Sequence, residues 1–195
     1  KTADPLVVPE LSKFNFEINS HPHDISGPVL SRLESELTRL WDKCANTAKE
    51  LDAKILAIGV LPTIQNHMLN LEAMSSLRRF SALNQQILRL RNGQPLALNI
   101  EGKDTLNVQH HDVMLEAVAT SLQIHLQVNP EEAVRLYNLS QIISAPMVGV
   151  AANSPYLFCK DLWDETRIPV FEQAVSVTSF RDSEGKAVGR VTFGT

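Results

Sequence analysis

Two stretches of alternating sequence carry polar side chains of a kind that could do chemistry on rigid strands. The alternate polar residues are Asn15, Glu17 and Asn19 within residues 13–19, and Ser121, Gln123, His125 and Gln127 within residues 115–128. If the two strands share a sheet, a carboxylate, several amides and an imidazole line the same face. Such a set could hold hydrated Mg²⁺, a hard ion that prefers oxygen ligands and bridges nucleotide phosphates. The alternative is a plain solvent-exposed face, which antiparallel sheets commonly have.

Two arginines could neutralise phosphate or carboxylate oxygens beside such an ion. Arg79 follows Arg78 in a predicted helix, and Arg167 stands two residues after Glu165. A guanidinium group binds these oxygens through two parallel hydrogen bonds. Each arginine also has a structural explanation, Arg79 as a solvated helix residue and Arg167 as the partner of a nearby acid. The sequence leaves both explanations open.

Other phosphate and metal motifs are absent from the sequence. It contains no Walker loop, no GxGxxG, and none of the common metalloprotease or zinc-finger spacings. His110 and His111 would point to opposite faces of a strand, which is more typical of two surface histidines than of a metal site. A metal-dependent hydrolase that uses His125 with His110 or His111 stays an alternative.

The elements that must position these residues follow from hydrophobic periodicity. Strands are predicted at residues 13–19, 54–61, 96–100, 106–109 and 115–128, with a hairpin of residues 174–180 and 187–193. Amphipathic helices are predicted at residues 30–51 and between residues 75 and 92. A third helix is predicted from the start signal Asn129-Pro130-Glu131-Glu132 to about residue 152. Strands that do not alternate regularly with helices indicate an α+β fold, with a mostly antiparallel sheet and helices packed on one face.

Composition limits the classes of protein that remain. The 195 residues fit one domain, and a net charge of −4 gives no electrostatic reason to expect nucleic acid. No apolar run approaches the roughly 18 residues of a membrane span, so no membrane partner is expected. Cys44 and Cys159 lie far apart and form no CxxC, which suits a reducing cytoplasm. The chain begins at Lys1 and ends just after a strand-like run, which favours a piece of a longer polypeptide.

Five sequence blocks stand in order along most of the chain. They are EL at 10–11 with FNFEIN at 14–19, GVLPT at 59–63, Met74 with RF at 79–80 and LN at 83–84, EA at 116–117 with TSLQIHL at 120–126, and ANSP at 152–155 with LW at 162–163 and ETR at 165–167. Together they resemble the glutamate–cysteine ligase family, specifically the bacterial branch called type 2.

The resemblance implies a glutamine-synthetase-like catalytic fold, in which an antiparallel sheet forms a funnel that holds ATP and Mg²⁺. It implies a reaction in two steps. ATP phosphorylates the γ-carboxylate of glutamate, and an amine such as that of cysteine then attacks the acyl phosphate. The roles expected from the resemblance are metal binding for Glu17 and His125, catalysis for Arg79 and Arg167, and substrate or nucleotide binding for Asn19, Gln123, Asn153 and Ser154.

The sequence also departs from the family pattern. The family's first strand, with its own metal-binding glutamates, would precede Lys1, and the family's C-terminal strands are incomplete. Cys159 stands where relatives often have glycine. We therefore expect residues 1–195 to form a single domain that is the central part of a ligase catalytic domain. A non-catalytic sensing or interaction domain of the same fold is the main alternative, and the sequence leaves open whether the chain forms a homo-oligomer.

Overall fold

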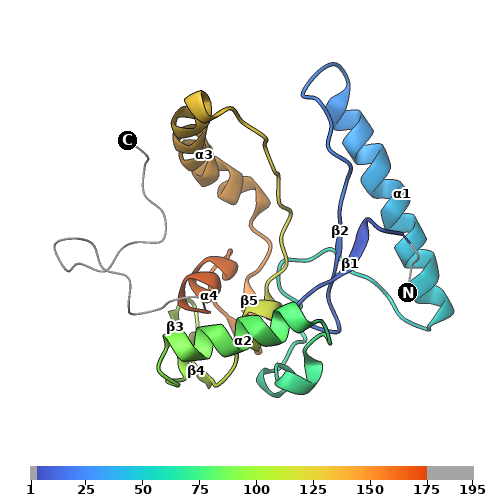
Figure 1. The fold of residues 1–195 in the computed structure, drawn as a ribbon. Helices are drawn as coiled ribbons and strands as arrows, with labels where there is room; N and C mark the ends of the chain where they lie inside the picture. The colour runs from blue at the N-terminus through green and yellow to red at the C-terminus, as the bar shows by residue number, and fades with distance from the viewer. Residues whose placement is uncertain (1–3, 175–195) are drawn as a thin grey trace.

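The computed structural model describes residues 4–174. The α-helices in this part of the chain are α1 (Val29–Glu50), α2 (Arg78–Leu90), α3 (Pro130–Ala151) and α4 (Arg167–Ala174). Short 3₁₀ helices lie at η1 (Asn66–Met68), η2 (Leu71–Ala73) and η3 (Val113–Val118). The strands are β1 (Val7–Pro9), β2 (Phe16–Ile18), β3 (Leu96–Glu101), β4 (Thr105–His110), β5 (Tyr156–Leu157) and β6 (Lys160–Asp161). Helices and small antiparallel sheets together make an α+β fold, as the sequence predicts (Figure 1).

The strands form separate antiparallel pairs rather than one sheet. In residues 4–174, β1 pairs with β2, β3 with β4 and β5 with β6, and no pair is hydrogen-bonded to another. Every pairing is antiparallel, as predicted. The prediction of one shared sheet with helices on one face is wrong for this part of the chain. Alternation shows that a segment has two faces, but it does not identify the strand that lies beside it.

Two predicted helices and one predicted hairpin are confirmed with small shifts at their ends. The helices at residues 30–51 and 129–152 are α1 and α3, and the strands at residues 96–100 and 106–109 are β3 and β4. α1 buries Leu40, Cys44 and Ala48, which recur at four-residue spacing along one face of the helix. Elements with a strong period and clear ends are therefore readable from the sequence.

α2 begins later than the sequence predicts. Leu77 rather than a serine occupies the position before the helix. The hydroxyl of Ser75 instead donates to the carbonyl oxygens of Glu10 and Ser12, the latter at 3.1 Å, and so joins the start of the chain to this segment. The predicted stop is confirmed, because Gly93 adopts a φ of 72° just after the helix.

The strand predicted at residues 54–61 is wrong. Only Val60 in this stretch bridges another segment, at Ala119. The strand predicted at residues 13–19 is shortened to β2, since a turn precedes it. The predicted hairpin of residues 174–193 lies outside the described residues except for its first residue, which ends α4.

The long strand predicted at residues 115–128 is also wrong. Its first part belongs to η3, because the side chain of Asp112 accepts a hydrogen bond from the amide of Met114 at 2.9 Å and caps the helical turn. Residues 120–128 have no strand partner among the described residues. Leu122 and Ile124, which form part of the apolar side of the predicted strand, are 81% and 74% exposed.

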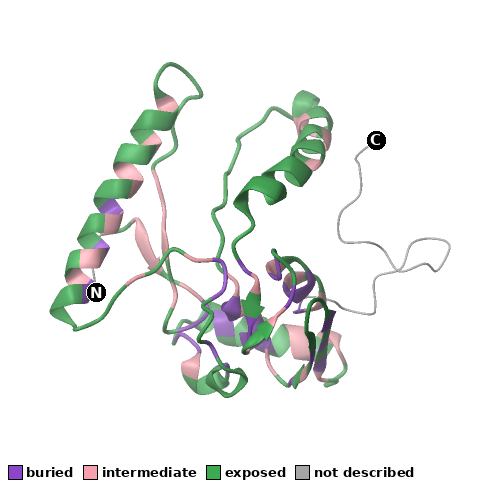
Figure 2. Cartoon of the chain, turned by 180° about the vertical axis from the view of Figure 1, so that it is seen from behind, coloured by how far each residue is buried: buried purple, intermediate pink, exposed green. Residues whose placement is uncertain are grey.

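The core lies in the lower body of Figure 1, where the β3–β4 hairpin, η3 and α4 pack together. Its most deeply buried side chains include Leu98, Ile100, Met114, Leu115 and Val170. α3 takes no part in this core, since none of its residues is buried and Figure 2 shows the helix as exposed with a few residues of intermediate exposure. In the described part of the chain, no helix, α3 included, has the length and apolar character needed to cross a membrane. We call residues 121–153, which comprise α3 and its flanking segments, the arm.

Candidate functional site

A pair of carboxylates lies on one face of the β1–β2 ladder. Val8 pairs with Glu17, and Glu10 follows Val8 by two residues, so the side chains of Glu10 and Glu17 share a face. Both residues are half-buried. Burial raises the pKa of Glu17, and the neighbouring carboxylate of Glu10 raises it further. The two acids therefore repel each other when both are ionised.

Two more side chains act on the same carboxylates. Arg79, near the start of α2, donates from Nη2 to the carbonyl oxygen of Pro9 at 3.0 Å. Its guanidinium carbon lies 4.6 Å from the centroid of the Phe80 ring. The positive charge of Arg79 opposes the rise in the pKa of Glu17, and His125 acts in the same direction. Charges from three segments far apart in the sequence therefore act on Glu17, and we call Glu10, Glu17, Arg79 and His125 the Glu17 cluster.

Two predicted amides are positioned next to this cluster. The backbone N–H of Asn19 donates to the carbonyl oxygen of Leu6 at 2.8 Å, which extends the β1–β2 ladder by one step. Asn19 follows Glu17 by two residues and so lies on the same face. Gln123 Oε1 lies 3.2 Å from His125 Nε2, so the amide contacts the imidazole of the cluster.

The donor set of the cluster suits a hard divalent cation. Two adjacent carboxylates offer the oxygen ligands that Mg²⁺ prefers, and a bound cation would remove their repulsion. Mg²⁺ usually binds a protein through only one or two carboxylates and takes its other ligands from water and phosphate. Within residues 4–174, no group of three or more histidine, cysteine, aspartate or glutamate side chains is arranged to hold a metal ion. Glu10 and Glu17 therefore fit a part of a magnesium site, which other ligands must complete.

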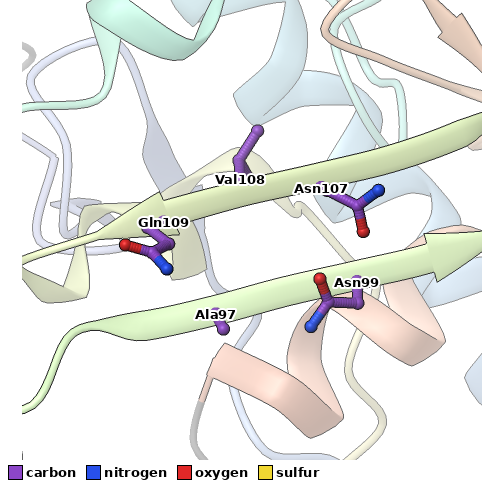
Figure 3. A pocket seen from close by; sticks show the side chains of 5 residues that line it. All are labelled: Ala97, Asn99, Asn107, Val108 and Gln109. Atoms are coloured by element: carbon purple, nitrogen blue, oxygen red, sulfur yellow. The ribbon is translucent and has the colours of Figure 1, made fainter.

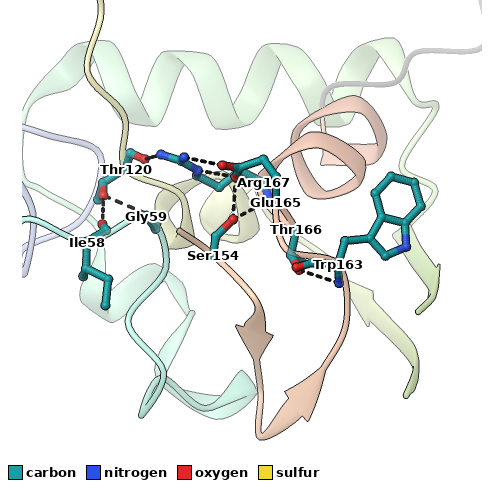
Figure 4. A network of polar contacts seen from close by, with 8 residues as sticks. All are labelled: Ile58, Gly59, Thr120, Ser154, Trp163, Glu165, Thr166 and Arg167. Atoms are coloured by element: carbon teal, nitrogen blue, oxygen red, sulfur yellow. Dashed lines mark hydrogen bonds and ion pairs between the residues drawn. The ribbon is translucent and has the colours of Figure 1, made fainter. Parts of the chain in front are cut away.

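The remaining predicted site residues belong to a polar network centred on Arg167 (Figure 4). Arg167 binds the carboxylate of Glu165 through Nε and Nη2, each at 2.5 Å, and its Nη1 donates to the carbonyl oxygen of Thr120 at 2.6 Å. The hydroxyl of Ser154 donates to the same carboxylate. Ser154 and Glu165 are buried, and the side chain of Arg167 is only 20% exposed. The pair is therefore bidentate and largely shielded from water.

The two charges of this pair stabilise each other. Burial raises the pKa of Glu165, but the hydrogen bonds from Arg167 and Ser154 outweigh that effect and leave the pKa below its ordinary value. The hydrogen bond to Glu165 raises the pKa of Arg167. Both groups are therefore ionised at neutral pH. This geometry matches the structural explanation for Arg167, while a role for Arg167 at the substrate stays a prediction.

Gly59 makes room for this network. A Cβ atom added to Gly59 would collide with Asn153 Oδ1 and would lie 3.0 Å from the guanidinium carbon of Arg167. The missing side chain of glycine allows this close approach, and a larger residue would displace the side chain of Asn153. Asn153 and Arg167 consequently lie against the same point of the backbone.

A protein-family model described as glutamate-cysteine ligase family 2 matches residues 3–191. The chain belongs to glutamate-cysteine ligase family 2. The match confirms the resemblance carried by the five sequence blocks and places the chain in a family of ligases. A search of curated proteins and a search of solved structures each found no match.

Sequence reasoning did not assign a site role to several residues of this glutamate-cysteine ligase family member. These residues are Glu10, Gly59, Thr120 and Glu165. Each one stands inside a block that resembles the ligase family, and that was the available signal. Gly59 and Thr120 have partners in other blocks, so their contacts depend on how the chain folds.

A shallow hollow on the β3–β4 hairpin lies apart from the predicted residues of this ligase family member (Figure 3). It is lined by Ala97, Asn99, Asn107, Val108 and Gln109. None of these side chains is ionisable, so the hollow offers no acid, base or charged ligand. It contributes no candidate chemistry.

His110 has a structural environment. It is buried, its Nε2 lies 2.6 Å from Asn66 Oδ1, and its Nδ1 lies 4.0 Å from Asp112 Oδ1. His111 is exposed. These contacts tie β4 to η1 and η3, and they give no support to a metal-dependent hydrolase that uses His110 with His125.

Proposed function

We propose that the protein is an ATP-dependent carboxylate–amine ligase whose catalytic domain has a glutamine-synthetase-like fold, with residues 1–195 as its central part. Its substrates are glutamate, ATP and an amine such as that of cysteine. Membership of glutamate-cysteine ligase family 2 supports the reaction class. The structural observation that carries the proposal is the carboxylate pair of Glu10 and Glu17 beside the anchored guanidinium of Arg79.

The chemistry explains why such a site needs positive charge. A carboxylate is a poor electrophile until one of its oxygens becomes part of a good leaving group. In the first step, a γ-carboxylate oxygen of glutamate attacks the terminal phosphorus of ATP, and the bond between that phosphorus and the bridging oxygen breaks to release ADP. In the second step, the amine nitrogen attacks the acyl carbon and loses a proton, and the carbon–oxygen bond to phosphate breaks. The first step brings negative oxygens together, so it depends on positioning and charge neutralisation.

The Glu17 cluster supplies these requirements. Glu10 and Glu17 would hold Mg²⁺, which neutralises phosphate oxygens when bound. His125 is proposed as a further ligand, with Gln123 orienting its ring. The hydrogen bond to Pro9 holds the guanidinium of Arg79 in place before a substrate arrives, so little ordering remains to be done on binding.

The other predicted residues are proposed to recognise the substrates or to support those that do. Asn19, Gln123 and Asn153 carry amides that can both donate and accept hydrogen bonds, as the polar groups of glutamate and a nucleotide require. The hydroxyl of Ser154 is already bound to Glu165, so its proposed contribution is to hold that carboxylate.

A cytoplasmic location is part of the proposal. Both cysteines are free, with Cys44 buried and Cys159 exposed. Exposed thiols persist in a reducing compartment, which is also where ATP is available.

Release of ADP by the full-length protein tests the function. With Mg²⁺-ATP, release should require glutamate and should rise when cysteine is added. Glu10→Gln and Glu17→Gln should each lower the rate roughly a hundredfold, because each removes one oxygen ligand of the charge-neutralising ion. Glu34→Gln, at an exposed position of α1, is the matched control and should leave the rate unchanged. Equal ADP release with every amino acid offered would rule out the ligase.

A non-catalytic sensing or interaction domain of the same fold is the second candidate. The observation that favours it is the lack of a group of three metal-binding side chains within residues 4–174. This candidate predicts that ATP binds to the full-length protein while no amine elicits ADP. Calorimetric titration with a non-hydrolysable ATP analogue, run beside the ADP assay, separates the two candidates.

A further inference from the structure

The ion pair of Arg167 and Glu165 joins the two ends of the arm, which we call its base. Thr120 immediately precedes the arm and Ser154 immediately follows it. Arg167 Nη1 donates to the carbonyl oxygen of Thr120 at 2.6 Å, and the hydroxyl of Ser154 donates to the carboxylate of Glu165. One ion pair therefore binds both ends of the arm, as Figure 4 shows.

The residue at the start of the arm is held from both sides. The amide of Thr120 donates to the carbonyl oxygen of Gly59 at 2.9 Å, and its hydroxyl donates to the carbonyl oxygen of Ile58. Arg167 takes the remaining backbone group, the carbonyl oxygen. Thr120 is therefore a fixed point from which the chain enters the arm.

The residue at the end of the arm is held in the same way. The amide of Ser154 donates to the carbonyl oxygen of Asp164 at 3.1 Å, and its carbonyl oxygen accepts from the amide of Thr166 at 3.1 Å. Its hydroxyl binds Glu165. Every polar group of Ser154 is thus engaged with the segment that carries the ion pair.

Between these two fixed points, packing does little to hold the arm. No residue from 121 to 153 is buried. The arm nevertheless carries Gln123, His125 and Asn153, of which His125 belongs to the Glu17 cluster. The positions of these side chains therefore depend strongly on how the base of the arm is fixed.

We propose that Arg167 and Glu165 are positioning residues, which fix the base of the arm and so set Gln123, His125 and Asn153 against the rest of the site. The catalytic consequence rests on the proposed function, whereas the fixing of the arm does not. Arg167 already serves three acceptor atoms and its charge is balanced by Glu165 at contact distance. A guanidinium committed in this way is poorly suited to hold a phosphate as well.

Amide hydrogen exchange in the full-length protein tests the fixing of the arm directly. Arg167→Lys keeps the charge but loses the planar fork, and Glu165→Gln loses the charge. Both should accelerate exchange at the Thr120 amide by about tenfold or more, because hydrogen bonds to charged groups are among the strongest. Exchange at the paired residues Leu98 and Val108 of the β3–β4 ladder should not change. Arg135→Lys is the matched control, since Arg135 pairs with Glu132 on the exposed surface of α3.

A second pair of variants keeps the charges of Arg167 and Glu165. It tests the proposal independently if Arg167→Lys or Glu165→Gln fails to fold. Gly59→Ala places a methyl group against Asn153 and Arg167 and should also accelerate exchange at the Thr120 amide. Gly149→Ala adds the same methyl group in open space within α3 and should have no such effect.

Steady-state kinetics then separates positioning from direct catalysis. If Arg167 positions the arm, Arg167→Lys and Glu165→Gln lower kcat for ADP release in parallel, and the double variant is no slower than either single variant. The inference is overturned if exchange at Thr120 is unchanged, if exchange rises while kcat is unchanged, or if only the Arg167 variant loses rate. Faster exchange in a protein whose wild type forms no ADP would support the fixing of the arm while refuting the ligase.

Discussion

The guanidinium of Arg79 donates a hydrogen bond to the carbonyl oxygen of Pro9 at 3.0 Å, and this contact joins α2 to the last residue of β1. Glu10 follows immediately, and its carboxylate shares a face with that of Glu17. α2 therefore places the positive guanidinium of Arg79 near the carboxylates of Glu10 and Glu17. In the proposed ligase, this arrangement would keep the carboxylates that bind Mg²⁺ near a guanidinium that binds phosphate.

Arg79→Lys is expected to lower kcat for ADP release by about a hundredfold, because lysine keeps the charge but cannot bind a backbone carbonyl and a phosphate with one planar fork. Arg78→Lys, at the exposed neighbouring position, should leave kcat unchanged. Steady-state assays with saturating Mg²⁺-ATP and glutamate measure both variants. Equal losses at the two positions would show that α2 as a whole, rather than Arg79, is responsible.

Glu17→Gln is expected to leave the protein no less stable at neutral pH. The pKa of Glu17 is raised above 4.5 in the folded state, so its ionisation lowers stability as pH rises from the ordinary value through the raised one. Glutamine removes that loss, and the advantage of the variant should grow across this pH range. Added Mg²⁺ should raise the unfolding midpoint of the wild type and not that of the variant. Thermal unfolding at pH 4 and pH 7, with and without Mg²⁺, measures these effects; a variant that still responds to Mg²⁺ would contradict the assignment.

Glu165→Gln should lower the free energy of unfolding at pH 7 by about 3 kcal/mol, because it leaves the Arg167 charge without its partner in a shielded place. The pKa of Glu165 is lowered, so this stabilisation is complete above the ordinary carboxyl pKa and disappears as pH falls through the folded value. Urea unfolding of variant and wild type at pH 7 and in acid should therefore converge in acid. A difference that does not depend on pH would indicate lost packing instead of a lost charge.

Leu98→Ala and Leu122→Ala should differ sharply in effect. Leu98 in β3 is fully buried, and its truncation should cost about 3 kcal/mol of unfolding free energy. Leu122 in the arm is 81% exposed, so its truncation should change stability by less than about 0.5 kcal/mol. Denaturant titrations of both variants check the contrast. A large cost at Leu122 would mean that the apolar side of residues 120–128 is covered in the full-length protein.

Local periodicity was sufficient for α1 and the β3–β4 hairpin, and the start signal at Asn129 and Pro130 was sufficient for α3. Each of these elements satisfies its own hydrogen bonds within a short stretch of chain. The segment from 115 to 128 shows the limit of this reasoning. Its alternation is a property of side chains, whereas a strand needs a neighbour along its length, and among the described residues the segment makes only an isolated bridge, from Ala119 to Val60. The side-chain cap of Asp112 stabilises a 3₁₀ helix, η3, in the first part of this segment.

In the candidate site, too, some residues could be predicted from the sequence and others depend on the folded structure. Glu17, His125 and Arg79 were predicted from residue type and from the resemblance, and the charges of Arg79 and His125 both lower the pKa of Glu17. The role of Glu10 depends on the β1–β2 register, and the Arg167 network depends on contacts between distant segments. Neither the register nor such contacts can be read from spacing alone, because both are decided by the folded chain.

The arm begins after Thr120 and ends before Ser154, and both residues are hydrogen-bonded to the ion pair of Arg167 and Glu165. The two ends of the arm lie together, as the ends of an insertion do. The rest of the chain could therefore be joined at this point without the arm. A short flexible linker in place of residues 121–153 would span the same gap, because the entropy of loop closure changes only slowly with length. Substitutions in the arm can therefore leave the hydrophobic core unchanged, because no residue from 121 to 153 is buried.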